Sequence, residues 1–135
     1  MNIRVALDPA FNDEYMSAAH QAHFKRVLYN WRRQLLEEVA GAASQMANSA
    51  ANDADPVDRA SQAEELQVAV RTQDRRRRLI DKIDSSIGSL DSKDYGYCEA
   101  CGVEIGIQRL HARPTATQCF DCKSLEEQKE RQVHG

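Results

Sequence analysis

The sequence has few of the residues that fill compact cores or interrupt helices. Of its 135 residues only 6% are aromatic, whereas 29% are charged. This composition is poorly suited to one compact sphere and favours long, solvated helices with a modest core elsewhere. The three prolines leave the stretch from Ser17 to Ala51 free of proline, so that a continuous helix can form there.

Long apolar runs and an excess of basic residues are also missing. No apolar run approaches the ~20 residues of a membrane span, and the N-terminus has no apolar core of signal-peptide length. We therefore expect a cytoplasmic protein that is not bound to a membrane. The formal net charge of −3 argues against a general nucleic-acid binder. Because no nucleophile–base pair, phosphate loop or glycine-rich dinucleotide motif is present, we do not expect an enzyme.

Two long stretches show the residue spacing of helices. From Ser17 to about Ala51, apolar residues recur in steps of three and four at Phe24, Leu28, Trp31, Leu35, Val39, Ala42 and Met46. A second helix should begin at Pro56 and end near Ser92. Its stripe comprises Ala63, Leu66, Val70, Gln73, Arg77, Ile80, Ile83, Ile87 and Leu90. The short turn between the two helices predicts an antiparallel hairpin.

If this turn lies near residue 55, residues that face each other have numbers that sum to about 110. Glu37 and Glu38 then lie opposite Arg71 and Gln73, which allows ion pairs between the helices. At about 35 residues, each helix would be roughly 50 Å long. Nothing else in the sequence is large enough to cover such an arm, so we expect it to project from the rest of the protein.

Four cysteines form two C-x2-C pairs separated by 17 residues: Cys98, Cys101, Cys119 and Cys122. Each pair can place two thiolates on one side of a tight turn, and together they complete a tetrahedral site suited to zinc. With four protein ligands the zinc would be structural. Redox dithiols and two disulfides are the alternatives, and disulfides are disfavoured without a secretion signal.

The fold predicted from these features is mainly α, with a coiled-coil hairpin, a small head containing a four-cysteine zinc finger, and a C-terminal helix. Residues 1–33 would form the N-terminal part of the head and the base of the first helix. Residues 34–89 would form the arm, with its tip at 52–60. Residues 90–135 would form the zinc finger and the C-terminal helix, which the charged stretch from Lys123 to Gln132 indicates.

The remaining charged residues have both a structural and a functional interpretation. Arg71 and Arg75–Arg78 can be a solvated face that pairs with Glu37 and Glu38, or a docking site for phosphate or an acidic protein surface. A nucleic-acid-binding zinc protein is the corresponding alternative function. His20 and His23 share the i, i+3 spacing without further ligands, which indicates a surface pair.

The predicted tip carries clustered acidic residues. Asp55 and Pro56 have the order of an N-cap followed by the first helical residue, and Asp58 falls at N3, where a carboxylate favours the helix dipole. Helix capping therefore explains both aspartates locally. It does not explain Asp53, or why a long arm should end in acid.

The tip DPVDRASQAEE, followed by YGYCEACGVEIGIQRLHARPT and CFDCKSLEE, closely resembles the DksA transcription factor family. The resemblance extends from about Tyr15 to Gly135. It implies a monomer that binds RNA polymerase directly, without sequence-specific binding to DNA, and inserts its arm through the secondary channel toward the active site. With the alarmone ppGpp, such a protein would alter open-complex stability, repress ribosomal RNA promoters and activate some biosynthetic promoters.

The resemblance also implies roles for individual residues, each identified by a match to the family's motif. The tip positions are Asp55, Asp58 and Ala60. The polymerase-contacting positions are Arg71 and Arg75. The ppGpp site, shared with polymerase, matches Leu79, Lys82, Arg113 and Lys123, whose cationic members suit a polyphosphate.

Overall fold

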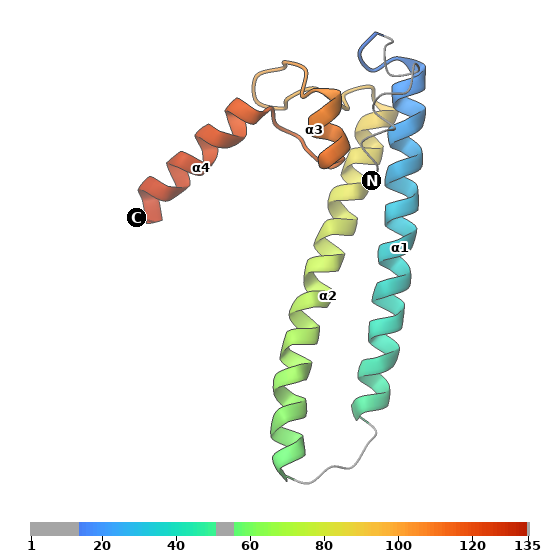
Figure 1. The fold of residues 1–135 in the computed structure, drawn as a ribbon, viewed down its shortest axis with the longest axis vertical. Coiled ribbons are helices and arrows are strands. Elements are labelled where there is room, and N and C mark those ends of the chain that lie inside the picture. Colours follow the sequence, from blue (N-terminus) through green and yellow to red (C-terminus); the bar gives the residue numbers. More distant parts are fainter. Residues whose placement is uncertain (1–13, 51–55, 135) are drawn as a thin grey trace. The chain divides into compact units, whose positions relative to one another are not determined.

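The computed structural model describes the backbone of residues 14–50 and 56–134, and the side chains of residues 14–48 and 59–133 (Figure 1). Its helices are α1 (Ala18–Ala50), α2 (Pro56–Asp91), α3 (Ile107–Ala112) and α4 (Phe120–His134). The described ranges contain no strand, only an isolated antiparallel bridge between Tyr97 and Glu104. None of these helices has the length and hydropathy needed to cross a membrane. The predicted helical fold is confirmed, and both long helices begin and end within one residue of their predicted bounds.

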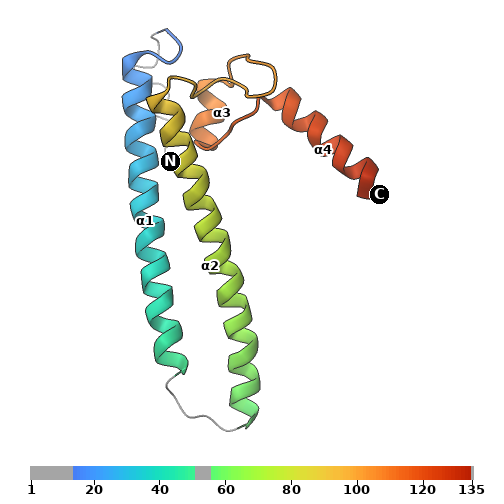
Figure 2. The same ribbon diagram turned by 180° about the vertical axis from the view of Figure 1, so that it is seen from behind.

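The chain divides into two compact units. We call residues 29–84 the hairpin unit, and residues 1–28 together with 85–135 the head unit. In the hairpin unit α1 and α2 run side by side in opposite directions, as both views show (Figures 1 and 2). The predicted antiparallel hairpin is therefore confirmed.

Three polar contacts join the helices of the hairpin unit. The Arg32 guanidinium lies 2.6 Å from the Asp84 carboxylate, and the Arg76 guanidinium lies 3.5 Å from the Glu38 carboxylate. The Gln73 amide donates a 2.9 Å hydrogen bond to the Val39 carbonyl. Contacting residues thus have numbers that sum to 112–116, so the predicted register is a few residues out. Glu38 pairs with Arg76, not with Arg71 or Gln73.

The stripe predicted for α2 is correct only in part. Gln73, Ile80 and Ile83 are buried, but Leu66 and Val70 remain 49% and 46% exposed. In this half of α2 the shielded side chains belong to neighbouring positions: Gln62, Ala69, Thr72, Gln73 and Arg76. The polar contacts of Gln73 and Arg76 set the rotation of α2 about its axis, and that rotation moves Leu66 and Val70 to the side of the seam.

The core of the head unit is aromatic and joins the start of α1 to the cysteine-rich segment. The ring of Phe24, fully buried, lies 5.6 Å from the ring of Tyr95. The Tyr95 hydroxyl donates a 2.7 Å hydrogen bond to the Pro114 carbonyl. The Tyr15 hydroxyl donates to the Gly96 carbonyl at 2.6 Å and accepts from the Gly106 amide at 3.0 Å. Segments about 80 residues apart in the chain are thereby held together.

The histidines near the start of α1 are not the surface pair that their spacing indicated. His20 is buried and accepts a 3.0 Å hydrogen bond from the Met16 amide at its Nδ1 atom. The His23 ring stacks on His111 of α3, with centroids 6.4 Å apart. Burial lowers the pKa of His23. The helical spacing was read correctly, but α3 covers this face through tertiary packing, which the spacing does not reveal.

Candidate metal centre and interaction surfaces

Two tight turns position the four cysteines in the head unit. After Cys98 the chain reverses at Gly102, whose φ of +81° is a conformation that glycine adopts readily. The Gly102 amide donates to the Cys98 carbonyl at 2.9 Å, and the Cys98 amide donates to the Val103 carbonyl at 2.8 Å. The second pair spans the start of α4, where the Cys122 amide donates to the Cys119 sulfur at 3.5 Å. Each C-x2-C pair therefore folds into a compact knuckle.

The two knuckles bring all four sulfur atoms within 4.8 Å of one another. The Cys101 and Cys119 sulfurs are 3.8 Å apart, and no disulfide joins any of the four. A tetrahedral zinc site with Zn–S bonds of about 2.3 Å requires sulfurs about 3.8 Å apart. The donor set and its spacing therefore fit zinc, with every ligand supplied by the protein.

The acid–base properties of these thiols also favour a bound cation. A hydrogen bond from the Cys119 backbone is the main cause that lowers the pKa of the Cys98 thiol to about 6. Hydrogen bonds with Cys119, Cys101 and Cys98 raise the pKa of Cys122 to about 12. The first thiolate therefore forms easily, whereas the last forms only against the charge already gathered there. A divalent cation at the centre removes this penalty, because it is bound by the deprotonated thiols.

The predicted tip lies largely outside the described residues. Helix α2 begins at Pro56, as expected. Asp55 lies outside the described residues, as does the side chain of Asp58, which belongs to the first turn of α2. Ala60 lies on α2 and is exposed.

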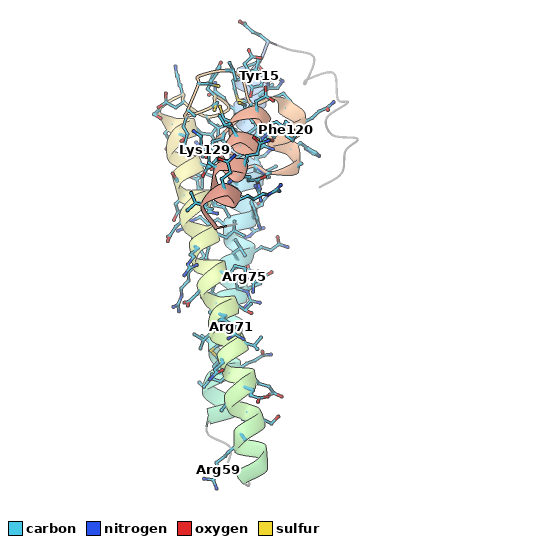
Figure 3. The ribbon with its side chains drawn as sticks, turned by 90° about the vertical axis from the view of Figure 1, so that its left-hand side faces the viewer. Tyr15, Arg59, Arg71, Arg75, Phe120 and Lys129 are labelled. Carbon is cyan, nitrogen blue, oxygen red and sulfur yellow. The ribbon has the colours of Figure 1, made fainter. Side chains whose placement is uncertain are left out.

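The polymerase-contacting positions named from the family resemblance lie on one side of α2. Arg71 and Arg75 are both exposed, and Figure 3 labels them on α2, with Arg59 nearer the start of that helix. Arg78 shares this exposure but was not singled out from the sequence. The i, i+4, i+7 spacing of Arg71, Arg75 and Arg78 could have identified it.

The four positions matched to the family's ppGpp site fall into two groups. Leu79 and Lys82 lie one turn apart on α2 in the hairpin unit, with Lys82 exposed. Arg113 and Lys123 belong to the head unit. Arg113 follows α3 and donates its amide to the Arg109 carbonyl at 2.8 Å, and Lys123 lies in the first turn of α4.

Two known families match the chain in succession. Residues 20–90 match the N-terminal domain of the DnaK suppressor protein DksA. Residues 93–128 match the prokaryotic dksA/traR C4-type zinc finger. The second match covers all four cysteines of the candidate metal centre.

Individual relatives match over nearly the whole chain. The chain is 52% identical to the RNA polymerase-binding transcription factor DksA of Escherichia coli (strain K12), over 91% of this chain and 82% of the relative. Identity to the protein of the same name from Haemophilus influenzae is 45%, over 92% and 86%. The solved structure of transcription factor DksA2 from Pseudomonas aeruginosa superposes with a TM-score of 0.85 at 33% identity, covering 95% of this chain and 97% of that one.

Proposed function

This chain belongs to the DksA family, and from that membership we propose that it is a transcription regulator that binds RNA polymerase directly. The observation that carries the proposal is the 52% identity, over 91% of the chain, to a relative named for binding RNA polymerase. The four-cysteine site supports a structural zinc in the head unit. We place the protein in the cytoplasm and regard it as a monomer that is not an enzyme.

In the proposed mechanism the helical hairpin enters the secondary channel of the polymerase and brings the turn at 52–60 toward the active site. Two helices of more than 30 residues support this role, because each is roughly 50 Å long. Asp55 and Asp58 at the turn would be presented by the start of α2. Their carboxylates would act close to the catalytic region and change the lifetime of the open complex.

Binding itself would depend on Arg71 and Arg75, which project from α2 into solvent. A guanidinium group suits an acidic protein surface because it offers several donors in a fixed plane. We further propose that ppGpp binds Leu79, Lys82, Arg113 and Lys123 together with polymerase. Two lysines and an arginine supply the positive charge that a polyphosphate requires.

The decisive experiment is transcription in vitro from a ribosomal RNA promoter, with and without ppGpp. Asp58→Asn removes one negative charge with little change in side-chain size. It should leave the affinity for polymerase within about twofold, as expected for a side chain that acts after docking, yet abolish repression. An Asp58→Asn variant that represses normally would refute the role of the tip.

The ppGpp site is tested in the same assay. The double variant with Lys82→Ala and Lys123→Ala should keep the repression seen without ppGpp and lose only the additional repression that ppGpp causes. An unchanged response to ppGpp would remove these residues from the site.

A further inference from the structure

Four basic residues of α2 lie in one line along the helix. Arg71, Arg75, Arg78 and Lys82 follow the spacing i, i+4, i+7 and i+11, which places them within about 60° of one another around the helix axis. We call these four residues the basic face. All four side chains are exposed, and the line they form is about 16 Å long at 1.5 Å per residue.

The basic face points away from α1. The buried residues Gln73 and Ile80 lie on the opposite side of α2, about 180–200° around the axis from Arg71. In Figure 3, α2 lies in front of α1 and carries the labelled Arg71 and Arg75. Packing between the two helices therefore does not use these cations.

Ion pairing within the hairpin unit does not use them either. Where the structure gives side chains, Arg76 pairs with Glu38 and Arg32 pairs with Asp84, and no residue of the basic face forms an ion pair. Asp74 offers Arg78 the i, i+4 spacing at which helical ion pairs form, yet this pair is absent. Asp74 and Asp81 lie to one side, about 70–90° from the centre of the face.

We infer that the basic face is one docking surface for an acidic surface of RNA polymerase, and that Arg78 is a further polymerase-contacting residue within it. Like charges at i, i+4 and i+7 repel one another and destabilise the free helix. In a chain of net charge −3, an unpaired line of four cations is complementary to an acidic partner, which would steer association and lower dissociation. Arg78 joins Arg71 and Arg75 to Lys82, so that protein and nucleotide contacts become continuous.

The inference rests on the proposed binding to polymerase and is tested with two neighbouring arginines. Arg78→Ala and Arg77→Ala each remove one positive charge from an exposed position. Arg77 differs only in that it lies about 130° away from the centre of the basic face. Variants of the full chain compete with fluorescently labelled wild type for core RNA polymerase, and thermal melts of both variants establish that they fold equally well.

Arg78→Ala should weaken binding about tenfold, as expected for the loss of one charge-assisted hydrogen bond, whereas Arg77→Ala should change it less than about twofold, as is usual for an exposed charge outside an interface. Arg78→Lys should recover part of the loss. Equal affinities for the two alanine variants would overturn the inference and leave the proposed function intact. A wild-type chain that does not bind polymerase would refute the proposed function itself.

The same variants are mixed with a fluorescent DNA duplex to test the competing partner. We expect no binding by the wild-type chain at physiological salt. Tight, steeply salt-dependent binding that Arg78→Ala abolishes would assign the basic face to nucleic acid and overturn the inference.

Discussion

Single side chains hold the head unit together across large distances in the sequence. Tyr15 contributes one hydroxyl that both donates to Gly96 and accepts from Gly106. Tyr95 is 5% exposed and donates to Pro114. With so few aromatic residues available, each buried ring accounts for a large part of the core, since an aromatic side chain buries more apolar area than other residues.

Tyr95 makes the stability of the head unit sensitive to alkaline pH. Burial is the main cause that raises its pKa well above the ordinary value of 10.0. Because the folded pKa exceeds the unfolded one, its contribution is fully present below about pH 10 and is lost as the pH rises toward the folded value. Urea unfolding curves recorded at pH 8 and at pH 10.5 should show a loss of stability at the higher pH.

Tyr95→Phe is the matched variant for this measurement. At pH 8 it should cost about 1 kcal/mol, because the hydrogen bond to Pro114 is lost. Between pH 8 and pH 10.5 it should lose less stability than wild type, since the ionising hydroxyl is gone. Parallel losses in the two proteins would show that other groups cause the alkaline sensitivity.

At the scale of elements, α1 and α2 contain residues that weaken them. Gly41 in α1 and Gly88 in α2 are exposed, and a methyl group at either position would meet no atom within 4 Å. Glycine lowers helix stability because its backbone loses more entropy on folding. Neither glycine serves a close approach between described elements.

Gly41→Ala and Gly88→Ala should therefore each raise the free energy of unfolding by about 0.5–1 kcal/mol, measured by thermal or urea denaturation. Gly96→Ala is the contrasting variant. Its φ is +92°, and an added methyl carbon would lie 3.0 Å from the Met16 Cγ atom, so this substitution should destabilise the head unit. A destabilising Gly41→Ala would indicate that the position has a contact in solution that the described residues do not supply.

At the scale of the whole molecule, the two units are stabilised by different means. The hairpin unit is joined by a seam of apolar side chains and by the contacts of Gln73 and Arg76. The head unit has a small core and four cysteines that fit zinc. Metal binding in zinc-finger peptides contributes on the order of 10–16 kcal/mol, more than such a core would supply alone.

Removal of zinc should therefore affect the two units unequally. After chelation, backbone amides of residues 93–128 should exchange with solvent much faster, whereas those of 59–84 should keep most of their protection. Cys122→Ser should cause the same change without chelator. Phe120→Ala is the control, because this side chain lies next to Cys119 but is 69% exposed. Unchanged exchange in 93–128 after verified zinc loss would contradict a structural role for the metal.

The sequence by itself determined the elements and their order. Apolar spacing, the absence of proline and the order Asp55–Pro56 predicted both long helices to within one residue, because helix formation and its start signals depend on nearby residues. The short turn then required an antiparallel hairpin. Two C-x2-C pairs predicted the metal centre, since each knuckle is itself a local turn.

Tertiary structure decided which neighbouring residues face each other. A period of 3.6 residues defines a broad helix face, so Leu66 and Val70 were as eligible for the seam as Ala69 and Gln73. The choice fell to Gln73 because its amide reaches the Val39 carbonyl, 34 residues away, and a buried amide is stable only with such a partner. The burial of His20, and the stacking of His23 on His111, likewise depend on groups that no local spacing brings together.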